Sequence, residues 1–427
     1  MRILMLAQFY PPVIGGEERH VLSLSEGLVQ RGHEVLVGTM PHPSRPPKLE
    51  LGGLTIQSVR GAFQRASGLF SEHERPHAPP FPDPELSWRL AEIVRSFQPD
   101  VVHSHNWMGH SYLPSSFRSK AAFVSTLHDY SKVCAVKTLT RRRENCAGPR
   151  LTACMSCASA HFGSLVGPVT ASANFVFTRA LDRAVDRFIA VSRSVAELCG
   201  LVGGRAPFDV VPTFIPDDTA ALPALADERV RQLPSDGFLL FVGDVNQRKG
   251  VHILLEAYAK LRGAPPLVLI GRRCPDTPHV LPENVMIFES WPYPAVMYAW
   301  SKALFGIAPS TWIEPCGTIQ MEANAVGRPM IASNLGGLPD LVDHGRTGLC
   351  VRPRDPEALA EAIQQMLDDE DLRSRLAKGA LAKAESFKAS TVIPRIESVY
   401  CAARAQRTAE GRSVTLASPA AEGSPRK

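Results

Sequence analysis

Short apolar runs alternate with segments of helical periodicity along most of the chain. The first run, 3–7, is followed by Val21, Leu24 and Leu28 at helical spacing and by a second run at 34–38. Short apolar runs of this kind are typical of buried parallel strands, and their regular alternation with helices predicts doubly wound α/β architecture. The predicted strands lie at 3–7, 34–38, 54–56, 99–106, 123–127, 187–193, 209–212, 238–243, 267–271, 284–288, 303–308 and 330–333, with one more after 344–349.

The alternation is interrupted once, at 217–236, where Ala, Pro and Asp predominate. This break divides the chain into a first Rossmann-like domain at 1–215 and a second at 216–385, each long enough for its own core. Further helices extend to about residue 405, and a helical region is expected at 161–186. The Ser-, Ala-, Gly- and Pro-containing segment 406–427 is expected to be disordered.

Composition narrows the class of protein. The chain has 427 residues, of which 44% are hydrophobic and 21% charged, as in ordinary soluble globular proteins. A net charge of +5 is small for this length and does not indicate a nucleic-acid partner. Because no apolar run reaches the length of a membrane span and no signal-peptide core is found, we expect a cytoplasmic protein, with peripheral contact to the inner membrane face left open.

The segment 314–325 carries the most informative chemistry. A buried strand ends before Pro309, and a helix is predicted from Gly317, so backbone N–H groups without helical partners would face an anion such as phosphate. Glu314 precedes this helix, and Glu322 lies one turn beyond Thr318. Two carboxylates that flank an anion site suit a nucleoside-diphosphate sugar, whose hydroxyls lie on both sides of the phosphates. Taken alone, the same two residues are equally typical of an ordinary helix N-terminus.

The residues that follow favour the ligand site. Gly327 and Pro329 end the predicted helix, and Gly336 and Gly337 open the next one. Together with two glutamates separated by seven residues, this succession resembles the retaining family 4 glycosyltransferases (the glycogen synthase and mannosyltransferase group 1) of the GT-B fold. The resemblance implies two Rossmann-like domains across a cleft, with the last helix, 386–405, packed back on the first domain.

The resemblance also assigns roles in the second domain. Glu314 would contact the donor sugar, Glu322 the ribose, and the helix start at Gly317, Thr318 and Ile319 the diphosphate. After the 238–243 strand, which ends at Gly243, Arg248 and Lys249 would bind the diphosphate. The family usually has Arg directly after this glycine, whereas this chain has Asp244. Either Arg248 compensates or the diphosphate is bound less tightly.

In the first domain the resemblance places the acceptor and part of the diphosphate site. The Gly15-Gly16 pair after the first strand would approach the donor, and His128, at the end of the 123–127 strand, would lie beside the reacting sugar. His128 can position a hydroxyl or move a proton. His103 and His105 alternate along another strand, and at least one of them is expected to be a hydrogen-bonded core residue. The loop-rich segment 41–84 would take part in acceptor choice.

Four of the nine cysteines, Cys134, Cys146, Cys154 and Cys157, lie close together in the sequence, in an insert at 134–157. In a cytosolic chain such a cluster favours a structural zinc site over disulfides. The spacing between the first three is irregular, so free thiols and an iron–sulfur or redox role remain alternatives. Some members of the family carry a similar insert.

We therefore predict an enzyme, a hexosyltransferase that moves a sugar from a UDP- or GDP-linked donor to a hydroxyl of a glycan, lipid or small-molecule acceptor. Catalysis is expected without a required metal cofactor. Two other classes stay open. One is a sugar-nucleotide-binding or phosphorylase-like GT-B protein without transferase activity, which Asp244 favours. The other is a redox or zinc-dependent regulator based on the cysteine cluster.

Overall fold

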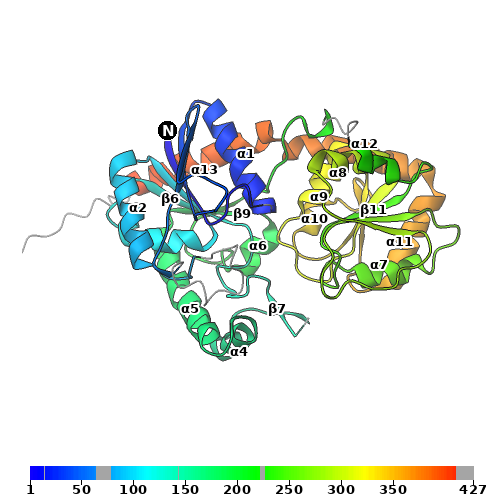
Figure 1. Ribbon diagram of the computed structural model, residues 1–427, viewed down its shortest axis with the longest axis horizontal. Helices are drawn as coiled ribbons and strands as arrows, with labels where there is room; N and C mark the ends of the chain where they lie inside the picture. Colours follow the sequence, from blue (N-terminus) through cyan, green and yellow to red (C-terminus); the bar gives the residue numbers. More distant parts are fainter. Residues whose placement is uncertain (14, 64–77, 143, 222–226, 410–427) are drawn as a thin grey trace, which may run out of the picture.

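The computed structural model describes residues 1–427 except 14, 64–77, 143, 222–226 and 410–427. Two large sheets, each covered by helices on both faces, form the two halves of the molecule (Figure 1). The first sheet ends at Val210 and the second begins at Leu239. The two-sheet α/β architecture predicted from the alternating pattern is therefore confirmed. Of the tail expected to be disordered at 406–427, residues 406–409 instead belong to helix α13, and 410–427 lie outside the described residues, as do 64–77 of the expected loops at 41–84.

The first sheet has eight strands in the order β10-β9-β6-β5-β1-β2-β4-β3, and all pairs are parallel except β3 with β4. Strand order reverses between β1 and β5, so the loops after these two strands diverge to opposite faces and leave a crevice between them. Strand β3 was not predicted, because residues 41–84 were interpreted as loops. The strands are β1 (Arg2–Ala7), β2 (Glu34–Thr39), β3 (Lys48–Leu51), β4 (Leu54–Ser58), β5 (Val101–His105), β6 (Ala122–Leu127), β9 (Arg187–Ala190) and β10 (Phe208–Val210).

The second sheet has six parallel strands in the order β13-β12-β11-β14-β15-β16, with the reversal between β11 and β14. The loops after these two strands contain Lys249 and Glu314, so strand order brings the two residues to one crevice. The strands are β11 (Leu239–Val242), β12 (Leu267–Ile270), β13 (Val285–Phe288), β14 (Phe305–Ala308), β15 (Met330–Ser333) and β16 (Gly348–Val351).

Alternate residues of each central strand enter different cores, as the two-residue repeat of a strand requires. In β1, Ile3 and Met5 pack against α1 and α13, whereas Leu4 and Leu6 face α2 on the other side of the sheet. The helices of the first half are α1 (Gly16–Gln30), α2 (Pro84–Phe97), the 3-10 helix η3 (Asn106–Tyr112), α3 (Leu113–Ser116), α5 (Val166–Ala184) and α6 (Arg193–Leu198).

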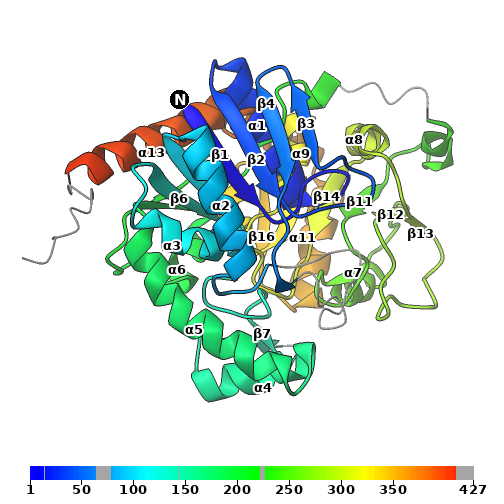
Figure 2. The same cartoon turned by 60° about the vertical axis from the view of Figure 1, so that its left-hand side comes forward.

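The second half is completed by helices after all of its strands except β12, which leads directly to β13, and the last helix returns to the first half. Helix α13 packs with Ile396 and Tyr400 in the same core as β1, and the Tyr400 hydroxyl lies 2.8 Å from His103 Nδ1. Figures 1 and 2 both show α13 running behind the first sheet. These helices are α7 (Val251–Tyr258), α8 (Tyr293–Lys302), α9 (Thr318–Ala325), α10 (Leu338–Leu341), α11 (Pro356–Asp368), α12 (Glu370–Ala384) and α13 (Ala389–Ala409).

The segment between β6 and β9 forms a projection from the first half, at the lower edge of Figures 1 and 2. It contains a short hairpin, β7 (Thr140–Arg141) with β8 (Glu144–Asn145), followed by α4 (Leu151–Phe162) and α5. The single helical region expected at 161–186 is wrong in its start. Two helices pack against each other there: α4 begins ten residues earlier than expected and ends at Phe162, where Gly163 with φ +86° interrupts the helix before α5 begins at Val166.

None of the described helices is long and apolar enough to cross a membrane.

Candidate functional site

Lys249 and Glu314 meet at the reversal point of the second sheet. Lys249 Nζ lies 2.6 Å from Glu314 Oε1, and the Ser310 hydroxyl donates to the same oxygen at 2.6 Å. The Glu314 side chain is only 7% exposed, whereas that of Lys249 is 27% exposed. An ammonium group has three N–H donors, so the pair with Glu314 leaves Lys249 able to bind a second anion from the exposed side.

The charge state of Glu314 follows from this contact. Burial raises the pKa of the carboxyl, but the charge and hydrogen bond of Lys249 and the Ser310 hydroxyl outweigh burial and hold the pKa below its ordinary value. Glu314 is therefore an anion at neutral pH. A buried carboxylate of this kind accepts hydrogen bonds and cannot serve as a proton donor.

Helix α9 begins directly after Glu314. Its N-cap residue, Gly317, has no side chain to cap the first N–H groups, and Thr318 and Ile319 at the helix start are half-buried. A Cβ at Gly317 would lie 2.0 Å from Gln320 Oε1. Both polar atoms of the buried Gln320 amide are without a hydrogen-bond partner in the described structure. The helix start thus combines free N–H groups with an unsatisfied amide, which suits an anionic or hydroxyl-bearing ligand.

Glu322 lies one turn further along α9 and is 5% exposed. Its nearest cation is Arg19 of α1 in the first half, with Nη1 4.0 Å from Glu322 Oε1, and the Arg19 guanidinium lies over the Tyr293 ring at 5.0 Å. Burial raises the pKa of Glu322 to about 7, and Arg19 limits the rise. The two glutamates therefore differ: Glu314 is fully ionised at neutral pH and Glu322 only partly. The role of Arg19 was not predicted, although it lies one turn into the helix that Gly16 begins.

Glycines allow the loops around Glu314 to pack without side chains between them. Gly336 has φ +62°, and a Cβ there would lie 2.4 Å from the Glu314 carbonyl oxygen. Gly337 donates its N–H to the Glu314 carbonyl at 2.7 Å. Gly250, directly after Lys249, has φ +78° and no room for a Cβ because the Pro309 carbonyl oxygen would lie 1.8 Å away. The backbone positions of Lys249 and Glu314 therefore depend on these glycines.

Asp244, the departure from the family pattern, has a cationic partner. Arg272, from the loop after the neighbouring strand β12, lies 3.1 Å from Asp244 through Nη2 and Oδ2. Arg248 is exposed, and its guanidinium lies over the Trp312 ring at 4.6 Å. Gly243, which precedes Asp244, has φ +141°, and its carbonyl oxygen contacts Gly271. Positive charge is thus retained at this edge of the sheet by Arg248, Lys249 and Arg272.

The first half contributes a cluster of neutral histidines. His128, at the end of β6, has Nε2 2.8 Å from His105 Nδ1, and the His20 ring lies 5.1 Å from that of His128. Burial, and then the neighbouring imidazoles, hold the pKa of His128 well below its ordinary value. The rings of His103 and His105 lie 4.2 Å apart, as their alternation along β5 predicts. His128 is therefore uncharged at neutral pH.

Helix α1 begins at the crevice of the first sheet. Gly16, its first residue, is exposed, and a Cβ there would meet no atom within 4 Å. The adjacent Glu17 accepts a hydrogen bond from Asn106, which follows β5. Burial, with the charges of Asp129 and Glu18, raises the pKa of Glu17 to about 8. Glu17 and Asn106 were not among the predicted residues.

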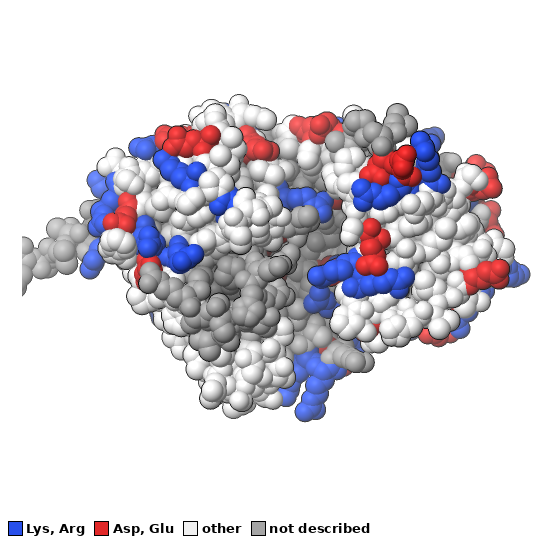
Figure 3. Space-filling model, in the orientation of Figure 1, with Lys and Arg blue, Asp and Glu red and all other residues white. Residues whose placement is uncertain are grey.

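A furrow is visible between the two halves in Figure 3, with Lys and Arg side chains along it. Direct contacts cross it: the Arg193 N–H donates to Asp340 Oδ2 at 2.7 Å, and Arg19 approaches Glu322. Arg354 of the second half also bonds to Glu144 of the β7–β8 hairpin. The four clustered cysteines lie away from Glu314, around a separate cavity in the insert.

Comparison with known proteins agrees with this arrangement. The model for Glycosyl transferases group 1 matches residues 227–383, and the model for Glycosyltransferase Family 4 matches residues 14–219. The chain belongs to the group 1 glycosyltransferases. This glycosyltransferase is similar to a glycogen synthase of Mycobacterium tuberculosis, with 29% identity over 435 residues that cover 95% of each chain.

Solved structures show the fold of this glycosyltransferase. A sucrose-phosphate synthase from Thermosynechococcus elongatus superimposes with a TM-score of 0.69 at 18% identity, covering 94% of this chain and 98% of that one. Anabaena HepE in complex with UDP-glucose gives a TM-score of 0.61 at 20% identity, covering 94% and 99%. The GT-B fold is therefore confirmed. The prediction of an enzyme is confirmed by the family models and by relatives that are named as glycosyltransferases or a glycogen synthase.

Proposed function

We propose that this glycosyltransferase moves a hexose from a nucleoside-diphosphate hexose to a hydroxyl acceptor with retention of the anomeric configuration. The observation that carries the proposal is the contact of Lys249, Ser310 and Glu314 beside the open start of α9. The UDP-glucose in the structure of the similarly folded HepE supports a donor of this class. A glycan, a lipid or a small molecule can supply the acceptor hydroxyl.

The diphosphate leaving group would bind where positive charge gathers. The Lys249 side chain is partly exposed beside Glu314, Arg248 lies over the Trp312 ring one residue before Lys249, and helix α9 begins three residues after Glu314 with N–H groups at Gly317, Thr318 and Ile319 that no side chain caps. Charge that develops on the departing phosphate is stabilised by fixed cations and by amide dipoles already in position. For this reason we propose that no divalent cation is required.

The two glutamates would bind hydroxyls on either side of the diphosphate. Glu314 is ionised and held by Lys249 and Ser310, so it can accept hydrogen bonds from the sugar without changing position. Glu322 lies one turn deeper along α9, beside Arg19, where ribose hydroxyls would reach it. The diphosphate between them would then lie over the start of α9.

The transfer itself would take place on one face of the sugar. The acceptor oxygen bonds to the anomeric carbon as the bond from that carbon to the phosphate oxygen breaks. The acceptor proton passes to the departing phosphate oxygen. Because the acceptor oxygen attacks the anomeric carbon directly, no enzyme nucleophile is used. The neutral His128 would orient a hydroxyl near this centre, because the contact of its Nε2 with His105 Nδ1 holds the imidazole ring in one position.

Nucleotide release and product configuration test the proposal. Purified protein is incubated with UDP-, GDP- and ADP-linked hexoses and an acceptor panel, with and without EDTA, and product anomers are assigned by NMR. We expect release with one donor class, EDTA resistance and a retained anomer. Lys249→Ala should lower kcat by about 10²-fold, as loss of a transition-state donor does elsewhere. An inverted product or full EDTA inhibition would refute the mechanism.

The chain offers a matched control. Lys260 and Glu357 form a second Lys–Glu pair at 2.8 Å, but on the exposed surface. Lys260→Ala should leave kcat and KM at the parent values. An equal loss of activity in both lysine variants would mean that Lys249 acts only through general stability, and the diphosphate role would be abandoned.

A further inference from the structure

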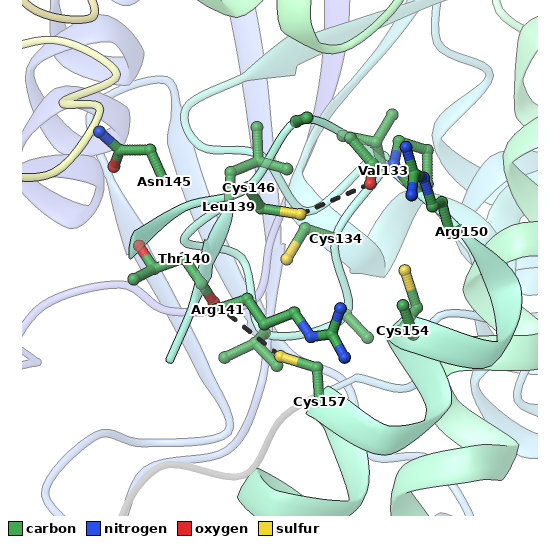
Figure 4. A pocket seen from close by; sticks show the side chains of 16 residues that line it. Val133, Cys134, Leu139, Thr140, Arg141, Asn145, Cys146, Arg150, Cys154 and Cys157 are labelled. Carbon is green, nitrogen blue, oxygen red and sulfur yellow. Dashed lines mark hydrogen bonds between the residues drawn. The ribbon is translucent and has the colours of Figure 1, made fainter. Parts of the chain in front are cut away.

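The insert between β6 and α5 contains a cavity of about 280 Å³ that the proposed reaction does not use. Its lining includes four of the nine cysteines: Cys134, Cys146, Cys154 and Cys157. Figure 4 shows their sulfur atoms directed toward the same space from three segments: the loop after β6, the residue after β8, and one turn of α4. All four are free thiols rather than disulfides.

Helix α4 positions two of these thiols together. Cys154 and Cys157 are three residues apart within Leu151–Phe162, so both side chains lie on one face of the helix. Cys134 and Cys146 approach the same space from the opposite wall. Two sulfurs from one helical turn and two from separate loop positions are typical of a closed tetrahedral thiolate site.

The backbone after Cys134 forms a turn, in which the Lys137 N–H donates to the Cys134 carbonyl oxygen at 2.9 Å. The N–H groups of Leu139, Val136, Thr138 and Lys137 lie near the Cys134 sulfur. Lys137 and Leu139 hold positive φ angles, +68° and +48°, which non-glycine residues adopt uncommonly. The turn therefore wraps its amides around the sulfur at a conformational cost.

The charged residues that line the described part of the cavity are two arginines, Arg141 and Arg150. A divalent cation bound by four thiolates carries net negative charge, which these arginines would balance.

We propose that Cys134, Cys146, Cys154 and Cys157 bind one zinc ion as a structural site. Each thiol releases its proton to solvent as its sulfur binds the ion, and no oxidant or reductant takes part. Among the described residues no three His, Cys, Asp or Glu side chains already form a metal shell, so the sulfurs must converge on the ion. Cys146 and Cys157 would leave their weak contacts with the Gly148 and Thr140 carbonyl oxygens, at 3.5 and 3.9 Å.

The site would stabilise a segment that reaches both halves of the enzyme. The β7–β8 hairpin pairs only two residues from each strand, too few to be stable alone, and it follows Cys134 and precedes Cys146. Its Glu144 bonds to Arg354 of the second half. Lys137, in the turn around Cys134, lies over the Trp107 ring of the first half at 4.5 Å. Zinc would thus fix the hairpin that links the insert to the donor domain.

Metal analysis of the full-length protein tests the site. We expect one zinc per chain by plasma mass spectrometry and four thiols protected from a thiol reagent until a chelator removes the metal. Cobalt in place of zinc should give the visible absorption of tetrahedral thiolate coordination. Zinc should be lost in Cys154→Ser and Cys157→Ser, and retained in Cys401→Ser, which changes an exposed thiol on α13.

Three results would overturn the proposal. The first is a parent protein without stoichiometric metal, in which the four thiols react as fast as Cys401. The second is iron with acid-labile sulfide in place of zinc. The third is full zinc content in both α4 variants. If these variants are insoluble, thiol protection and the cobalt spectrum of the parent protein still decide the question.

Discussion

Replacing Glu322 by Gln removes a buried carboxylate whose ionisation the fold opposes. The side chain is 7% exposed on α9, and its nearest cation, Arg19, is 4.0 Å away with a side chain that is 53% exposed. Glutamine keeps the size and the hydrogen-bonding oxygen but cannot ionise. The substitution therefore separates the charge of Glu322 from its packing.

The magnitude follows from the pKa of Glu322, which burial raises from its ordinary 4.5 to about 7. At about 1.36 kcal/mol for each pKa unit, ionisation costs the folded protein about 3 kcal/mol relative to the unfolded chain. A carboxyl with a raised pKa in the folded state stabilises the fold fully below pH 4.5. That stability is lost as pH rises toward 7. The Gln variant does not undergo this loss.

Unfolding by denaturant at a series of pH values measures the effect. The difference in unfolding free energy, Glu322→Gln minus parent, should rise by about 3 kcal/mol between pH 4 and pH 8. All other titrations are common to both proteins and cancel. In the same variant we expect weaker donor binding at pH 8, because ribose hydroxyls lose an ionised acceptor.

Glu357→Gln is the matched control, since Glu357 is exposed and paired with Lys260, and its pKa is lowered by that hydrogen bond. The difference in unfolding free energy, Glu357→Gln minus parent, should not rise with pH. If the unfolding free energies of Glu322→Gln and the parent changed in parallel with pH, the reasoning would be refuted, because Glu322 would then have the same pKa in the folded protein as in the unfolded chain.

Three further outcomes are expected. Gly336→Ala should lower the unfolding free energy by more than about 2 kcal/mol, because φ is +62° and the new Cβ would overlap the Glu314 backbone. Gly345→Ala is the control: φ is +73°, but nothing lies near the new Cβ, so the same denaturant measurement should show a loss of only about 1 kcal/mol. His128→Asn should lower kcat at every pH, with a pH–rate profile parallel to the parent because the ring is neutral throughout; a lost ionisation near pH 6.5 would contradict this. Arg354→Ala should raise protease sensitivity in the β7–β8 hairpin, and unchanged cleavage there would rule out the contact with Glu144.

Local patterns predicted most of the fold. Apolar runs marked nearly every strand of both sheets, because a parallel strand buried on both faces needs a short continuous run. Asp followed by Pro is typical of a helix start, and at α11 the Asp355 carboxylate accepts the Ala358 N–H at 2.9 Å, with Pro356 as the first helical residue. The start of α4 and the exposed edge strand β3 were missed, since neither has a distinctive apolar period. The residue roles of His128, Gly16, Arg248 and Glu322 remain predictions until variants are assayed.

What the sequence determined by itself was the chemistry available at each strand end: a lysine after β11, a glutamate after β14, a histidine as the last residue of β5 and another directly after β6. Which of these meet was decided by strand order, which places β11 beside β14 and so joins Lys249 to Glu314. Contacts between the halves, such as Arg19 with Glu322, depend on how the two sheets are packed. Such pairs are separated by many residues, and no local periodicity encodes them, because their energy comes from burial and charge in the assembled furrow.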